Sequence, residues 1–120
     1  MHDELTTRRW LIKAMTVLQR VDDADGRFLA SMRVNDVSKL SAADELQVAT
    51  WDATLWTAMN PCPDVELGQR VALMLNTYAE VALTAQRAIT DPSADSEATI
   101  DRLGDLLAVV DDQSRTLDAW

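Results

Sequence analysis

The stretch from Asp64 to Asp91, DVELGQRVALMLNTYAEVALTAQRAITD, decides the fold class of this chain. Its apolar residues recur at steps of three and four, which places them on one face of an α-helix. They are Leu67, Val71, Met74 with Leu75, Tyr78, Val81 with Ala82, Ala85 and Ile89. Asp64 is expected to cap the start of this helix, and Asp91-Pro92-Ser93 to end it. We therefore predict one long amphipathic helix here.

The same periodicity predicts helices before this stretch. The first is expected from about Asp3 to Ala24. Gly26 is a candidate break, so the segment from Phe28 to about Val37 is either a separate helix or a continuation. Ser41, with Asp44 three residues later, predicts the cap of the next helix, which ends at the Pro61-Cys62-Pro63 segment.

A last helix is predicted to start near Ser96 or Ala98. Its apolar stripe is close to heptad spacing and comprises Ile100, Leu103, Leu107, Val110 and Leu117, with Ser114 in the gap. With only three glycines, three prolines and 5% aromatic residues, the 120-residue chain offers little for β-turns. We predict an all-α fold, a single domain over residues 1–120, built as a four- or five-helix up-and-down bundle.

The residue content argues against catalysis and metal binding. The one histidine, His2, lies at the terminus, and the one cysteine, Cys62, has no partner at metal-site spacing. The run from Asp22 to Gly26 lacks two ligands of a calcium loop and is interpreted as a solvated helix end. Adjacent acids such as Asp22 and Asp23 do not face one another, as a catalytic carboxylate pair would. We expect no enzyme activity, no cofactor and no metal site.

The net charge of −9 disfavours direct binding to a nucleic acid backbone. Acidic residues are concentrated from Asp91 onward, where the sequence has eight of them and two basic residues, Arg102 and Arg115. The N-terminus has no signal-peptide pattern, no apolar run is long enough to span a membrane, and the single cysteine suits a reducing compartment. We therefore expect a cytoplasmic protein that does not bind membranes.

Two of the four tryptophans lie five residues apart on the predicted second helix. At ~100 degrees per residue, Trp51 and Trp56 point about 140 degrees apart, so one can be in the core while the other lies at an interface. Both can equally be packed inside. The last helix likewise is either an ordinary bundle helix or a partner surface. The candidate partner-binding residues are Trp51, Leu55, Trp56, Leu107, Val110 and Trp120.

The order of several segments resembles the FlaF family, small helical regulators of flagellar biosynthesis in alphaproteobacteria. The resemblance covers about residues 11–92, and its central segment is Trp51-Asp52-Ala53-Thr54-Leu55-Trp56-Thr57. The family has an aromatic-Asn-Arg-x-Leu-Trp-Thr segment there, and this chain has Asp52 and Ala53 where that pattern has Asn and Arg. The resemblance implies a non-catalytic protein that binds flagellin before export.

Two function hypotheses and a third option follow from these patterns. The first is a non-enzymatic protein-binding module, a monomer or homodimer, whose partner is flagellin if the resemblance holds. The alternative is an acidic phage-type inhibitor, whose carboxylates imitate nucleic acid and occupy a basic surface of a nucleic-acid-binding enzyme. A phage or virion assembly adaptor is the third option and predicts stable oligomers.

Overall fold

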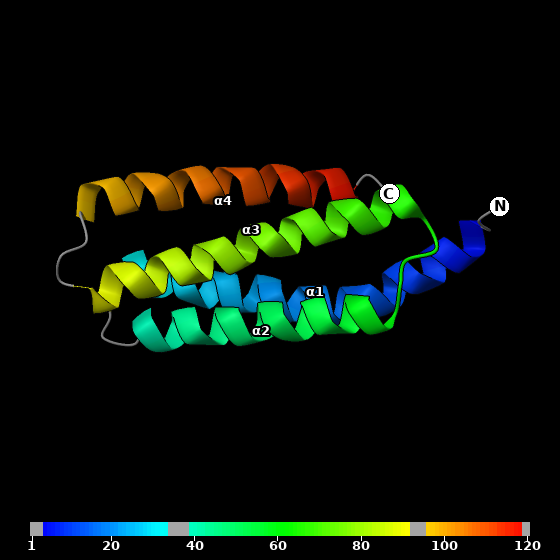
Figure 1. The fold of residues 1–120 in the computed structure, drawn as a ribbon, viewed down its shortest axis with the longest axis horizontal. Coiled ribbons are helices and arrows are strands. Elements are labelled where there is room, and N and C mark those ends of the chain that lie inside the picture. Colours follow the sequence, from blue (N-terminus) through cyan, green and yellow to red (C-terminus); the bar gives the residue numbers. More distant parts are fainter. Residues whose placement is uncertain (1–3, 34–38, 92–95, 119–120) are drawn as a thin grey trace.

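The computed structural model, which describes residues 4–33, 39–91 and 96–118, is a helical rod 52 Å long and 21 Å across (Figure 1). Its helices are α1 (Glu4–Arg33), α2 (Lys39–Met59), α3 (Val65–Thr90) and α4 (Ser96–Asp118). Each runs antiparallel to the one before it, and the described residues contain no strand. The prediction of an all-α up-and-down bundle is confirmed, with four helices rather than five.

Of the two options that the sequence left open at Gly26, the structure shows the continuation, because α1 runs through this residue to Arg33. Glycine costs a helix interior about 1 kcal/mol relative to alanine. Ala24 and Phe28, on either side of Gly26, are both buried in the core, and their burial outweighs that cost. The apolar pattern on both sides of the glycine therefore belongs to one helix.

The first residues of α2 and α3 test two capping predictions. Ser41 does not cap α2, because this helix already begins at Lys39 and Ala42 and Ala43 are buried within it. Asp64 does cap α3: its Oδ1 accepts a hydrogen bond from the Leu67 amide at 2.9 Å. At the other end of α3, the Asp91 amide donates to the Arg87 carbonyl at 2.9 Å, as the predicted stop requires.

The core contains side chains from all four helices, and α3 contributes the most. The whole predicted stripe of α3 from Leu67 to Ala85 is buried, and Ile89 is half-buried. The predicted stripe of α4 is partly wrong: Ile100 is 63% exposed, while Leu106 is buried beside Leu103 and Val110. The close packing of α4 is on α3, and Ile100 lies outside the face that α4 buries there.

Close packing joins only helices that follow one another in the sequence: α1 packs on α2, α2 on α3, and α3 on α4. The Trp10 indole of α1 donates a hydrogen bond to the carbonyl of Asn60, the residue after α2, at 2.7 Å. The side between α1 and α4 lacks such packing along the described residues. The bundle is therefore open along one of its four sides.

The core assignment predicts opposite effects for two leucines on α3. Leu75 is 2% exposed, so Leu75→Ala should lower the free energy of unfolding by about 2–5 kcal/mol. Leu73, two residues away, is 58% exposed, so Leu73→Ala should change it by less than about 0.5 kcal/mol. Urea denaturation followed by circular dichroism measures both. Equal losses in the two variants would show that the buried face of α3 is assigned wrongly.

Candidate functional site

The outer face of α2 carries a line of exposed apolar side chains, here called the α2 stripe. It consists of Val48, Trp51, Leu55 and Met59, which are 60%, 69%, 49% and 74% exposed. Their spacing of i, i+3, i+7 and i+11 keeps them in one row along the helix. A row of this length on one helix face differs from the scattered apolar residues found on most surfaces.

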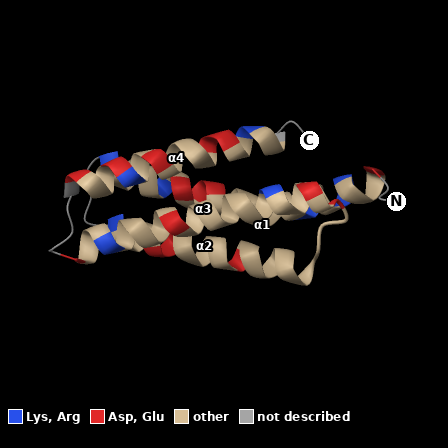
Figure 2. Ribbon diagram, turned by 45° about the horizontal axis from the view of Figure 1, so that its top comes forward, with Lys and Arg blue, Asp and Glu red and all other residues tan. Residues whose placement is uncertain are grey.

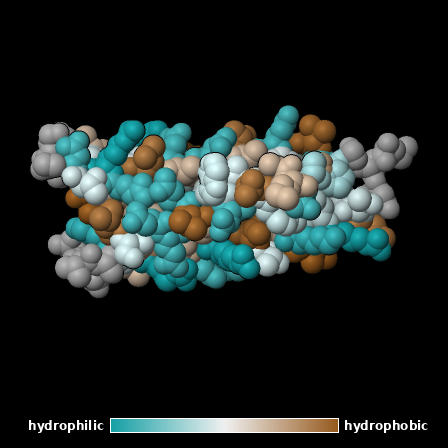
Figure 3. All heavy atoms as spheres, turned by 60° about the horizontal axis from the view of Figure 1, so that its bottom comes forward, coloured by the Kyte–Doolittle hydropathy of each residue, from teal (hydrophilic) through white to brown (hydrophobic). Residues whose placement is uncertain are grey.

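The opposite face of α2 is the one that enters the core. Ala43, Leu46 and Ala53 are fully buried there, and the buried Thr50 hydroxyl donates to the Leu46 carbonyl at 2.7 Å. Thus α2 is apolar on both sides, a pattern found in helices that are covered all round. Here only one side is covered. Figure 3 shows apolar side chains (brown) interrupting the hydrophilic surface of the lower face.

Charge is sparse on this helix compared with the rest of the rod. Between Thr50 and Pro63 the only charged residue is Asp52. Figure 2 shows no charged residue in the C-terminal third of α2, whereas α4 carries acidic residues along its length. The α2 stripe is therefore an apolar surface with little electrostatic cost of dehydration.

The structure brings together only some of the predicted partner-binding residues. Trp51 and Leu55 lie in the α2 stripe. Trp56 lies on the α1 side of the helix, where its ring centroid is 5.7 Å from that of Trp10 and the two ring planes are inclined by 46°. On α4, Leu107 is half-buried and Val110 is buried in the core. Trp120 lies outside the described residues.

Sequence reasoning missed Val48 and Met59, although both continue the row of Trp51 and Leu55. The detectable pattern was the apolar content of both faces of α2. Val48 shares the helix face of Trp51 and Leu55 in the sequence pattern, and Met59 extends that face by one turn. Of the two arrangements that the sequence left open for the tryptophans, the structure shows the one in which Trp56 packs against Trp10 and Trp51 is exposed.

The two tryptophans should differ in what they contribute to stability. Trp56→Ala should lower the free energy of unfolding by about 2–4 kcal/mol, because it removes packing against Trp10. Trp51→Ala should change it by less than about 0.5 kcal/mol, since 69% of this side chain is exposed. Thermal and urea unfolding of the two variants provide the comparison. A large loss on removing Trp51 would contradict its position on the free face.

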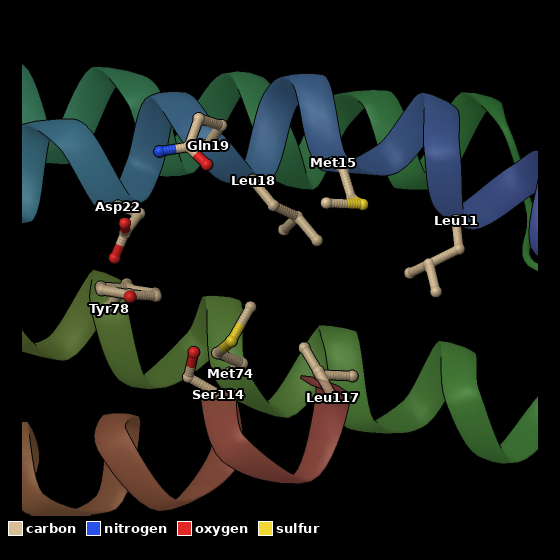
Figure 4. A pocket seen from close by; sticks show the side chains of 9 residues that line it. All are labelled: Leu11, Met15, Leu18, Gln19, Asp22, Met74, Tyr78, Ser114 and Leu117. Atoms are coloured by element: carbon tan, nitrogen blue, oxygen red, sulfur yellow. The ribbon is translucent and has the colours of Figure 1, made fainter. Parts of the chain in front are cut away.

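A second feature is a hollow of about 370 Å³ on the open side of the bundle, here called the α1–α4 groove (Figure 4). Its residues come from three helices: Leu11, Met15, Leu18, Gln19 and Asp22 of α1, Met74 and Tyr78 of α3, and Ser114 and Leu117 of α4. Figure 4 shows the Asp22 carboxylate pointing toward Tyr78 at one end, with the apolar side chains along the rest. The groove is thus apolar with an acidic end.

The acidic residues near this end are not a solvated helix terminus, as the sequence suggested. They lie in the middle of α1, and Asp25 is only 8% exposed. Its Oδ1 has no hydrogen-bond partner within the described part of the chain. Burial, and secondly the charge of Asp22, raise the pKa of Asp25 to about 6. Burial also raises the pKa of Tyr78, with further contributions from Asp25 and Asp22.

Asp25 should make folding dependent on pH. Its pKa in the folded protein is above the ordinary value of 3.8, so the folded state holds a proton that the unfolded chain releases. The free energy of unfolding should therefore fall as pH rises from about 4 to about 6, by up to ~3 kcal/mol.

Asp25→Asn should remove most of that fall and raise stability at pH 7 by about 1–3 kcal/mol. Urea titrations at pH 4, 5, 6 and 7 measure it. Asp105→Asn, which changes an exposed carboxylate of α4, is the matched control and should change stability by less than about 0.5 kcal/mol at pH 7. An Asp25→Asn variant that is less stable than the parent at pH 7 would contradict the burial of an uncompensated charge.

The described residues also bear on metal binding, thiol chemistry and membrane insertion. No group of three or more His, Cys, Asp or Glu side chains in residues 4–33, 39–91 and 96–118 is arranged to hold a metal ion. Cys62 is half-buried, and burial raises the pKa of its thiol. None of the described helices has the length and apolar character needed to cross a bilayer. No protein-family profile, curated protein or solved structure matches this chain.

Proposed function

We propose that this protein is a non-enzymatic protein-binding module and that the α2 stripe is its docking surface. The observation that carries the proposal is the row of Val48, Trp51, Leu55 and Met59, each about half exposed or more, on a helix whose other face is fully packed. Covering such side chains releases water from apolar surface, at roughly 25 cal/mol per Å². Tryptophan at the centre of a docking face is a typical anchor.

The spacing of the stripe favours a helical partner. Rows at i, i+3, i+7 and i+11 interlock with a matching row on another helix, as in coiled coils and helix-in-groove complexes. Asp44 and Asp52 are exposed on the same helix as the stripe, so basic residues beside the partner's apolar row would match them. A second copy of this chain would bring acidic residues toward acidic residues. The charges therefore favour a different protein.

For the identity of the partner, we propose flagellin, through its amphipathic terminal helices. The support is the resemblance to the FlaF family, whose central segment from Trp51 to Thr57 overlaps the α2 stripe. A protein that covers those helices before export would prevent premature assembly. In this role the module acts by binding alone and needs no reactive group.

The test is titration calorimetry with flagellin from the same organism. Leu55→Glu places a charge in the centre of the α2 stripe and should weaken binding at least 30-fold, equivalent to about 2 kcal/mol. Leu73→Glu, at a 58% exposed site on α3, is the matched control and should leave binding within twofold. Flagellin that binds both variants equally would exclude the stripe as the docking surface. Flagellin that does not bind the parent protein would exclude it as the partner.

A second candidate function, the acidic inhibitor, is favoured by one feature of α4. Asp101, Asp105 and Asp112 are all exposed and share the outer side of this helix. Binding of a basic enzyme surface to such a row would weaken steeply with salt. Binding through the α2 stripe should change little between 50 mM and 500 mM salt, so repeating the titration at both concentrations separates the two functions.

A further inference from the structure

We propose that the α1–α4 groove is a second docking site, which receives an amphipathic helix of a partner protein with a lysine or arginine directed at Asp22 and Asp25. The proposal is independent of the function assigned to the α2 stripe. It depends on the open side of the bundle, on the pattern of α1 along that side, and on the charges at its acidic end.

A heptad-like row on α1 borders the groove. It runs through Leu11, Met15, Leu18, Asp22, Asp25 and Leu29, with alternating steps of four and three; its first four members line the groove, and the last two continue the row beyond it. Residues spaced in this way form a seam, the strip along which one helix packs against another in a coiled coil. It extends over ~27 Å at 1.5 Å per residue, which is the scale of a helix rather than of a small molecule. Leu11, Leu18 and Leu29 are half-buried against the core, whereas Met15 and Asp22 are exposed, so the row is only partly covered within the described residues.

The other walls of the groove leave space for incoming side chains. Met74 and Tyr78 of α3 line it together with Ser114 and Leu117 of α4. Ser114 occupies a position of the α4 heptad pattern where a large apolar residue would fill the space, and the hollow measures about 370 Å³. Protein interiors are normally close-packed, so an apolar hollow of this size leaves contacts unmade. Two or three apolar side chains of a docked helix would supply them.

The acidic end determines the charge of the occupant. Asp25 is 8% exposed, and its Oδ1 lacks a hydrogen-bond partner among the described residues. Asp22 faces Tyr78 at the edge of the groove (Figure 4). Arg27, two residues after Asp25, forms an ion pair with Glu45 of α2. A buried carboxylate without a cation is unfavourable, and a cationic side chain that reaches it forms a strong charge-assisted hydrogen bond.

Two acids at successive seam positions also select the register of the partner. A polar residue in an apolar seam is satisfied only when a complementary group lies opposite, so it determines which helix fits and in which alignment. A helix with glutamate at the matching position would be repelled. A helix with leucine there would leave Asp25 buried and unpaired. The row therefore favours a helix that is apolar on one face and carries a single basic residue within it.

The methionines make the test specific to each surface. Met15 and Met74 line the groove, whereas Met59 belongs to the α2 stripe. The protein is labelled with ¹³C at its methionine methyl groups and titrated with a synthetic 21-residue peptide. This peptide has leucine at heptad positions a and d, and lysine at the central a. A matched peptide has glutamate in place of the lysine.

The lysine peptide should shift the Met15 and Met74 methyl resonances and leave Met59 unchanged. It should bind at least 10-fold more tightly than the glutamate peptide. In the double variant Asp22→Asn with Asp25→Asn, that preference should fall to within twofold. Leu55→Glu, which disrupts the α2 stripe, should leave binding of the lysine peptide unchanged, so failure here is distinguishable from failure of the proposed function.

Ser114→Leu supplies a control that keeps both carboxylates. It fills the hollow from the α4 side and should weaken the lysine peptide at least 10-fold while the circular dichroism spectrum stays helical. The proposal is overturned if the lysine peptide leaves Met15 and Met74 unshifted, if it shifts Met59 alone, if the two peptides bind equally, or if Ser114→Leu binds as well as the parent protein.

Discussion

Burial of one broad apolar face on α3 is the constraint on which the rest of the structure depends. The face extends from Leu67 to Ala85 and needs cover from two sides, which α2 and α4 provide. Short connections make each helix antiparallel to the one before it, so α1 packs on α2. The close packing of α4 is with α3, and the side between α4 and α1 has no such packing along the described residues.

The two faces proposed to bind partners differ in chemistry because they arise in different ways. The α2 stripe is a surplus apolar row on a helix that already packs through its other side, and Asp52 is the only charge along its second half. The α1–α4 groove is a gap between helices, with an apolar lining that ends at Asp22 and Tyr78. A nearly uncharged row recognises shape and apolar area, whereas an acidic end adds selection by charge.

Asp25 illustrates a conflict between stability and a binding surface. A carboxylate at 8% exposure with an unpaired oxygen costs free energy that an apolar residue at this position would not. Such violations of the rules for a stable core are concentrated at functional sites in natural proteins. By contrast, the buried Thr50 hydroxyl has its hydrogen bond within α2, so its burial is compensated. Of these two buried polar side chains, Asp25 is the one with an oxygen that has no hydrogen-bond partner among the described residues.

What the sequence by itself determined is the local structure: the helical class, the cap at Asp64, the buried face of α3, and the separation of Trp51 from Trp56 around α2. These depend on periodicity and capping chemistry within one segment. Only the tertiary structure decided that α1 runs through Gly26, that Leu106 rather than Ile100 is buried, and that Asp25 is enclosed. Whether a helix face is covered depends on where neighbouring helices lie, and the spacing of residues within one helix contains no information about that position.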